Sequence, residues 1–278
     1  MPEGDTVWLA AKRMHDALAG RLLTATDFRV PALATTDLSG RTVNEVAARG
    51  KHLLTRIDGG LTLHTHFRMD GTWHLYKTGT RWTGGPDWQV RVVLTTDAWV
   101  AVGYRLPVVE LLETSRENDA VGHLGPDILG EDWDEDEALR RLRAMPDRQI
   151  GPALLDQRNL AGIGNLYKTE ALYISGVTPW TTVADVADLA GVVRRAVRLM
   201  RANRDHWQQT TTGSMRPGED HWVFERAGRP CRRCGATVAS AMQAEPGREI
   251  YERLSYWCPR CQTGPAPDPE PRRRRVRG

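Results

Sequence analysis

Apolar and polar residues follow two different patterns along the chain. Near the N-terminus, apolar side chains recur at helical spacing over residues 5–18, and Gly20 follows the last of them. Between Arg41 and about Leu112, short apolar runs are separated by turn residues. This pattern predicts strands at residues 51–57, 61–67, 72–76, 90–94 and 99–102. We therefore expect a helix followed by an antiparallel β-sandwich or barrel.

Helical spacing returns after Leu112. The acidic cluster Glu131–Glu137 leads into a predicted helix over residues 138–145, and acids before arginines suit the helix dipole. Pro146 interrupts the pattern. Further helices are expected over about residues 147–157, with Asp147 as N-cap, from Asn165 to near Gly176, and over about residues 183–201.

The cysteines form two CxxC pairs, Cys231-Arg-Arg-Cys234 and Cys258-Pro-Arg-Cys261. Each pair makes a tight turn that presents two sulfurs, and two such turns complete a tetrahedral site for one structural zinc ion. The alternative of two disulfides is disfavoured in a chain without a secretory signal. The intervening segment, with a return strand at residues 249–256, predicts a β-hairpin zinc ribbon. Arg253 lies in that strand.

A turn with two glycines, Gly162-Ile-Gly164, precedes the helix that starts at Asn165. Glycines allow close approach of a ligand, and the helix N-terminus attracts anions. The turn is therefore suited to a DNA phosphate. An ordinary helix–helix connection that needs two glycines is the alternative at this point.

Composition and charge limit the class of protein to which the chain can belong. Hydrophobic residues make up 40% and charged residues 26%, which is typical of a globular protein. No apolar run of about 18 residues would span a membrane, and the acidic, polar start does not resemble a signal peptide. We therefore expect a cytoplasmic protein without membrane association. The net charge is only +3, but arginines concentrate toward the C-terminus, as a basic face for an anion or as solvated side chains.

The N-terminus is a candidate chemical group. Removal of Met1 would expose the secondary amine of Pro2, and an α-amino group with a pKa of about 7.7–8.0 is partly neutral at pH 7. Attack of this amine on an aldehyde sugar gives an iminium ion, and the adjacent Glu3 could transfer protons. From these residues alone, a simple processed terminus remains the alternative.

Several motifs follow one another in a characteristic order. These are Met1-Pro2-Glu3-Gly4, Lys51 at a strand start, His66-Phe67-Arg68-Met69-Asp70-Gly71, the Gly162–Asn165 turn and Cys258-Pro-Arg-Cys261-Gln262. Together they resemble the formamidopyrimidine-DNA glycosylase / endonuclease VIII family from Pro2 to Gln262. The opening Pro-Glu-Gly is most similar to the endonuclease VIII (Nei) branch.

The resemblance implies a bifunctional DNA glycosylase/AP lyase that excises oxidised bases and nicks the abasic site by β,δ-elimination. Pro2 would be the nucleophile and Glu3 the general acid/base. Lys51 and Arg253 would contact phosphate and assist catalysis, and Asn165 would bind phosphate. Met69 would fill the gap left by the extruded nucleotide, with a core methionine as the alternative; His64 and His66 are interpreted as structural.

Departures from the family pattern bear on the substrate. Thr6 replaces a glutamate found in many relatives, although Asp5 is adjacent. Around Tyr104–Pro107 there is no clear counterpart of the Arg–Phe pair of the formamidopyrimidine branch. The stretch Thr210–Asp220 is short for the loop that covers an oxidised purine in that branch. These features favour oxidised pyrimidines or hydantoins as substrates.

The expected fold is α+β and multidomain. A β-sandwich catalytic domain (residues 1–115) is followed by a helical helix–two-turns–helix domain (116–225), a zinc-ribbon hairpin (226–262) and a disordered basic tail (263–278). The expected protein is a nucleoid-associated monomer that binds damaged DNA. The alternative hypotheses are a damage- or abasic-site-binding protein with little turnover, and a general zinc-ribbon protein of transcription or translation.

Overall fold

The computed structural model describes residues 2–244 and 252–267. It contains two compact units, Met1–Glu131 and Asp132–Gly278. Within the described residues, no helix combines the length and apolarity needed to cross a membrane. The expected return-strand residues 249–251 and most of the expected basic tail, residues 268–278, lie outside the described part. The four-part division with boundaries after residues 115, 225 and 262 stays a prediction.

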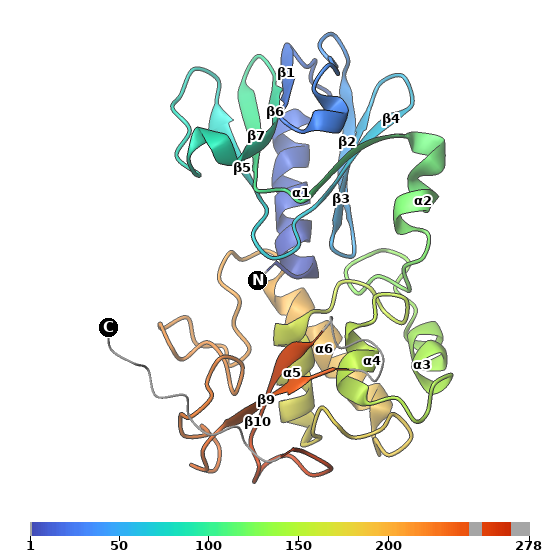
Figure 1. Cartoon of the computed structure of the whole chain (residues 1–278), viewed down its shortest axis with the longest axis vertical. Helices are drawn as coiled ribbons and strands as arrows, with labels where there is room; N and C mark the ends of the chain where they lie inside the picture. The colour runs from blue at the N-terminus through green and yellow to red at the C-terminus, as the bar shows by residue number, and fades with distance from the viewer. Residues whose placement is uncertain (1, 245–251, 268–278) are drawn as a thin grey trace. The chain divides into compact units, whose positions relative to one another are not determined.

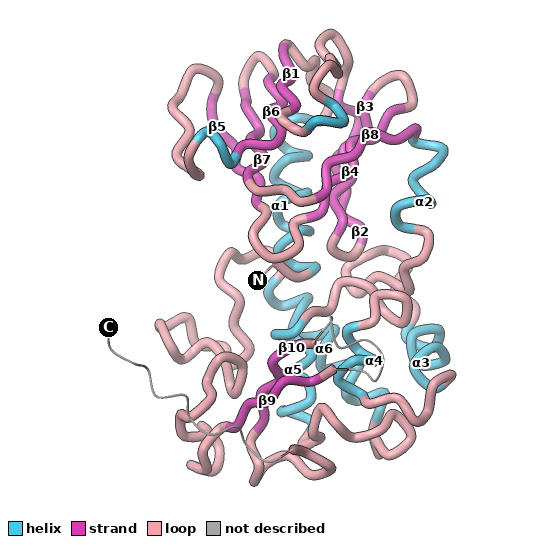
Figure 2. The backbone as a smooth tube through the Cα atoms, viewed as in Figure 1, coloured by secondary structure: helices cyan, strands magenta, loops and turns pink. Residues whose placement is uncertain are grey.

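The first unit contains helix α1 and two four-stranded antiparallel sheets (Figures 1 and 2). One sheet has the order β1-β6-β7-β5 and the other β2-β3-β4-β8. The elements of this unit are α1 (Gly4–Leu18), β1 (Ala25–Phe28), β2 (Val43–Arg49), β3 (His52–Ile57), β4 (Leu61–His66), β5 (Thr72–Lys77), β6 (Val90–Thr95), β7 (Trp99–Tyr104), β8 (Val108–Glu113) and α2 (Glu117–Val121).

Helix α1 contacts strands of both sheets, which explains its strongly apolar stripe. Val7, Met14 and Leu18 on α1 are buried in one hydrophobic cluster with Leu53 of β3 and Leu94 of β6. Burial of this cluster removes apolar surface from water, which is the main favourable contribution to folding. The N-terminal end of α1 is therefore held rigidly by the core of the unit.

The second unit combines helices with a two-stranded hairpin (Figure 1). Its elements are α3 (Glu135–Arg143), α4 (Ile150–Leu155), α5 (Asn165–Ser175), α6 (Leu189–Asn203), β9 (Ala239–Gln243) and β10 (Arg253–Trp257). Helix α5 contacts α4, α6 and β10, so it is the central element of the unit. The predicted fold class is confirmed: an N-terminal helix with antiparallel sheets, then helices, then a hairpin with the cysteines.

Three predicted helix starts are wrong. Helix α3 begins at Glu135 instead of residue 138, because the Asp134 carboxylate accepts the Glu137 N–H at 3.0 Å and caps the helix there. Helix α6 begins at Leu189 instead of near residue 183, because the Asp188 carboxylate accepts the Gly191 N–H at 2.8 Å and caps the helix there. The preceding Val183 and Val186 are buried, so their helical spacing reflects burial in turns. Helix α4 begins at Ile150, not at about residue 147, and Asp147 is not its cap.

The sequence pattern did not predict three strands of the first unit, β1, β2 and β8. Strand β2 contains Glu45, Ala47 and Ala48, which are weak strand formers. Its pairing with β3 and its packing against α1 stabilise it in spite of this composition. The prediction of β3 to β7 is confirmed within a few residues, and so is the helix from Asn165 to Gly176.

Candidate active site and DNA-binding residues

Pro2 and Glu3 lie at the N-terminal end of α1. Glu3 is the N-cap residue of this helix and is fully buried, while Pro2 is partly exposed. Asp5 in the first turn is also buried, whereas Thr6 is partly exposed. A carboxylate at a helix N-terminus is stabilised by the helix dipole. The structure therefore places a protected carboxylate next to the residue whose amine Met1 removal would expose.

Lys51 lies in the two-residue turn between β2 and β3, not in the strand itself as predicted. Arg49 and His52 pair across this turn, and Gly50 adopts a left-handed φ of +57°, which suits the first position of such a turn. The Gly50 N–H donates to the buried Asp127 carboxylate at 2.6 Å. Asp127 thus fixes the turn that carries Lys51, a role that sequence analysis missed although Gly125-Pro126-Asp127 is a marked turn signal.

Met69 lies in the loop of residues 67–71 between β4 and β5, and 57% of its surface is exposed. Exposure excludes the alternative of a core methionine. Arg68 has a left-handed φ of +46°, and its N–H donates to His66 Nδ1 at 2.9 Å. The Arg105 guanidinium donates to the Asp70 carbonyl at 3.1 Å. The loop is therefore ordered by bonds on both sides of an apolar tip.

The turn before α5 is also tightly bonded. Gln157 donates to the Ile163 carbonyl at 3.0 Å and accepts the Gly162 N–H at 3.0 Å, and Gly162 has a left-handed φ of +99°. Burial raises the pKa of Asp156, but Arg158 and Arg148 outweigh it and hold that pKa well below its usual range. The ionised Asp156 accordingly fixes the start of the turn.

Helix α5 brings Asn165 and the strand of Arg253 together. Asn165 is the first residue of the helix, and its side-chain amide donates to the Leu254 carbonyl at 2.9 Å. Three residues along, the buried Lys168 donates to Ser255 Oγ at 2.8 Å. Arg253 is exposed at the start of β10. The Asn165 side-chain oxygen is buried and has no hydrogen-bond partner among the described residues.

Glu170 on α5 is a further buried charged residue that sequence analysis did not identify. Its carboxylate accepts backbone N–H groups from Trp222, Val223 and Phe224, each at 2.8 Å. A carboxylate with several such donors is a strong anchor. It fixes the segment that leads from the helices to the cysteine hairpin.

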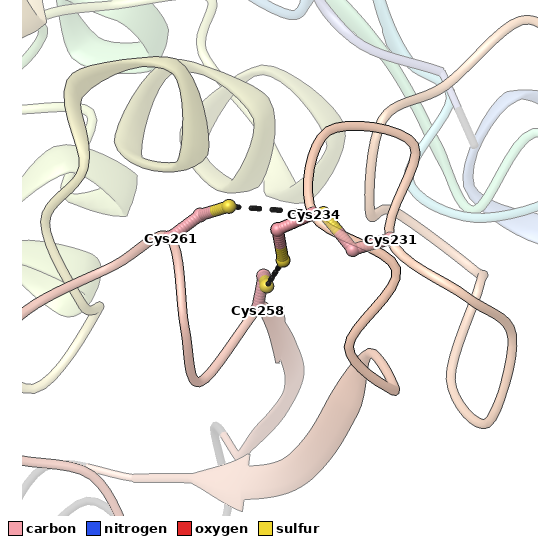
Figure 3. A group of neighbouring side chains, drawn as sticks. All are labelled: Cys231, Cys234, Cys258 and Cys261. Carbon is pink, nitrogen blue, oxygen red and sulfur yellow. Dashed lines mark hydrogen bonds between the residues drawn. The ribbon is translucent and has the colours of Figure 1, made fainter.

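The four cysteines face one another from two turns (Figure 3). All four sulfurs lie within 4.8 Å of one another, with 3.4 Å between Cys234 and Cys258 and 3.9 Å between Cys231 and Cys261. A tetrahedral ion with Zn–S bonds of about 2.3 Å separates its sulfurs by roughly 3.8 Å. These distances fit one four-coordinate metal ion and exceed an S–S bond of about 2.05 Å.

The fold and these motifs together define the class of protein. Residues 1–105 match the family model of the formamidopyrimidine-DNA glycosylase N-terminal domain, and residues 124–206 match that of the formamidopyrimidine-DNA glycosylase H2TH domain. The chain belongs to the formamidopyrimidine-DNA glycosylase / endonuclease VIII family, which confirms the resemblance found in the sequence.

Individual relatives are more specific. The chain is 58% identical to "Probable endonuclease 8 2" of Streptomyces coelicolor, over 97% of this chain and 96% of that protein. It is 44% identical to "DNA-(apurinic or apyrimidinic site) lyase Nei2" of Mycolicibacterium smegmatis, over 95% and 99% of the two chains. The fold is similar to that of Lactococcus lactis Fpg in a complex with abasic-site DNA, with a TM-score of 0.77, 21% identity and coverage of 94% and 100%.

Proposed function

We propose that this chain is a bifunctional DNA glycosylase/AP lyase that excises oxidised bases and then nicks the abasic site. The observation that carries the proposal is the Pro2–Glu3 pair at the start of the core helix α1, with Glu3 fully buried. Membership of the family and the lyase name of a close relative support it.

The chemistry follows from the secondary amine of Pro2. Its nitrogen attacks the sugar C1′ and loses its proton, while the C1′–base bond breaks and the base leaves in protonated form. The C1′–O4′ bond then breaks, O4′ takes up a proton, and the opened sugar is left as an iminium ion between C1′ and Pro2, with Glu3 as the group that transfers protons. The iminium makes the C2′ proton acidic, so loss of this proton forms a C2′–C3′ double bond and breaks the C3′–O bond, which expels the 3′ phosphate (β-elimination). Loss of a further proton then expels the 5′ phosphate (δ-elimination).

The remaining site residues would hold the DNA. Lys51 in its turn, Asn165 at the start of α5 and Arg253 at the start of β10 would contact phosphates, with Lys51 and Arg253 also assisting elimination. One N–H of the Asn165 amide is used by Leu254, so its second N–H would serve the phosphate. The exposed Met69 would fill the gap in the base stack.

The metal in the cysteine site would be one structural zinc ion held by Cys231, Cys234, Cys258 and Cys261. Four thiolates satisfy a tetrahedral zinc ion and leave no position for a catalytic water. The ion would fold the hairpin that carries Arg253. The measurable consequence is one equivalent of zinc per chain by elemental analysis.

Oxidised pyrimidines or hydantoins are the proposed lesions. The Arg105 guanidinium donates to the Asp70 carbonyl and to the Gln89 side chain, so Arg105 supports the loop of Met69. The residues that follow it, Leu106 and Pro107, do not supply the phenylalanine of an Arg–Phe pair. Damaged DNA is the partner, and we propose a monomer that acts in the cytoplasm on the nucleoid.

Borohydride trapping on a duplex with one abasic site tests the mechanism. The Met1-processed protein should give a covalent protein–DNA band, because borohydride reduces the iminium to a stable amine. Pro2→Gly and Glu3→Gln should abolish turnover while abasic-DNA binding persists. Unchanged cleavage in both variants would overturn the mechanism.

The controls separate Pro2 from other amines. Lys51→Arg keeps the charge but removes the lysine nucleophile, so trapping should persist and the cross-linked peptide should map to Pro2. An N-terminal tag that blocks the amine should abolish trapping, whereas a C-terminal tag should not. Tight binding of abasic DNA without any trapped band would instead support the damage-binding hypothesis.

A further inference from the structure

A group of histidines occupies the face of the sheet β2-β3-β4-β8 that points away from the core. His52 on β3 is paired with His66 on β4, and His64 lies two residues earlier on the same face. The ring of His52 is 4.6 Å from that of His66 and 6.1 Å from that of His123, measured between ring centroids. We call these four residues the histidine cluster; the proposed reaction assigns it no role.

A chain of hydrogen bonds runs into this cluster from the sheet edge. The carboxylate of Glu110, on β8, lies 3.0 Å from Nδ1 of His64, and Nε2 of His64 lies 2.8 Å from Nδ1 of His52. Glu110 is paired with His64 in the strand register, so the backbone fixes the contact. His64 is almost fully buried and so links the surface carboxylate to His52.

This chain fixes where the ring protons lie. A carboxylate only accepts, so His64 Nδ1 must donate to Glu110. In its neutral form, His64 then has a lone pair on Nε2 and accepts from His52 Nδ1. The lone pair of His52 is therefore left on Nε2, which is the less common tautomer for a free histidine.

His66 has the opposite arrangement. Its Nδ1 accepts the Arg68 N–H, so a neutral His66 carries its proton on Nε2. The cluster thus combines a histidine with a free acceptor, His52, and a histidine with a free donor, His66, in edge-to-face contact.

The surroundings keep both rings neutral. The pKa of His52 is lowered to about 3, mainly by burial and further by the charges of His66, His64, His123 and Lys51. For His66 the pKa is about 4, with burial as the main cause, followed by the charges of Lys51, His64 and Arg68. Lys51 directly precedes His52 and lies in the turn that the Arg49–His52 pair closes, so it adjoins the cluster in the backbone.

We infer that Glu110, His64 and His52 form a hydrogen-bonded relay that fixes the ring of His52 and thereby positions Lys51, the preceding residue in the turn. Because His52 closes the turn that carries Lys51, a ring of His52 held by His64 restrains the end of that turn. Glu110, His64 and His52 are therefore positioning residues for Lys51. The inference rests on the proposed role of Lys51 as a phosphate contact.

Long-range ¹H–¹⁵N spectra of ¹⁵N-histidine-labelled full-length protein at pH 7.5 test the relay without DNA. His52 and His64 should both carry the proton on Nδ1, with assignment from His52→Asn and His64→Asn. Glu110→Leu should shift His64 and His52 toward the Nε2–H form. The matched control Glu113→Leu removes an exposed carboxylate from the same strand and should change neither tautomer. A proton on Nε2 of His52 in the unmodified protein would overturn the relay.

Binding to a duplex with a reduced abasic-site analogue tests the link to Lys51. Glu110→Leu should weaken binding about two- to fivefold, because Glu110 is 55% exposed and exposed ion pairs contribute modestly. Glu110→Gln keeps an acceptor for His64 and should restore most of the affinity. In a Lys51→Ala background, Glu110→Leu should cause no further loss.

The outcomes separate the two proposals. Unchanged binding in Lys51→Ala would refute the phosphate role of Lys51, whatever the tautomers show. Loss of binding in Lys51→Ala together with full affinity in Glu110→Leu would refute the positioning role. Loss of binding in Glu110→Leu that Glu110→Gln does not restore would also count against the relay, because it would indicate a structural effect.

Discussion

The turn that carries Lys51 depends on one buried carboxylate, so we predict that Asp127→Ala selectively loosens this turn. Asp127 accepts the Gly50 N–H at 2.6 Å and the Leu129 N–H at 3.1 Å, and only 3% of its surface is exposed. Removal of the carboxylate leaves two N–H groups without this acceptor in a region that water hardly reaches.

The magnitude follows from these two bonds. A hydrogen bond to a charged group contributes about 1.5–3 kcal/mol. Since both bonds use one carboxylate, their losses are not independent, and we expect about 2–4 kcal/mol for local opening of the turn. At about 1.4 kcal/mol per factor of ten, this increases the open population on the order of 30- to 1000-fold.

Hydrogen exchange measured by mass spectrometry over residues 43–57 is the assay. Faster exchange of these amides in Asp127→Ala, together with weaker binding of abasic DNA, is the expected result. Asp127→Asn keeps one side-chain acceptor, so its exchange rate and its affinity for abasic DNA should lie between those of the unmodified protein and Asp127→Ala. Asp58→Ala removes an exposed aspartate from the far end of β3 and should change neither quantity. Unchanged exchange around Gly50 in Asp127→Ala would refute the reasoning.

Three further predictions concern the Met69 loop, pH and the metal. Gly71→Ala places a Cβ 2.7 Å from the Phe67 carbonyl oxygen, so the loop must shift; excision of an oxidised base should fall more than tenfold while borohydride trapping on a preformed abasic site persists, and equal losses in both assays would contradict this. His52 and His66 have folded-state pKa values of about 3 and 4, below the unfolded value near 6.5. Between these limits the unfolded chain binds more protons than the folded chain. The free energy of unfolding should therefore decrease as the pH is lowered, by up to about 1.4 kcal/mol per pH unit for each histidine, as urea titrations from pH 7 to 4 can show. Removal of zinc by a chelator, or Cys234→Ser, should lower the melting temperature and the affinity for DNA, and added zinc should restore only the chelated protein.

Much of this protein is determined by local sequence. The apolar stripe of α1, the short strands β3 to β7 and the helix from Asn165 to Gly176 follow from periodicity and turn residues, because these signals act over a few neighbours. The cysteine site could also be predicted from the sequence, because two CxxC turns supply four thiolates independently of where the hairpin lies in the fold. The order of the motifs along the chain was also sufficient to indicate the family.

Tertiary structure decided the rest. Strand β2 and the late start of α6 depend on pairing partners and on the Asp188 cap, which spacing alone does not indicate. The support of Lys51 by Asp127 and the relay from Glu110 to His52 join residues far apart in the chain. Such contacts arise only when strand register brings distant polar groups together in a region of low water access, where each must find a partner.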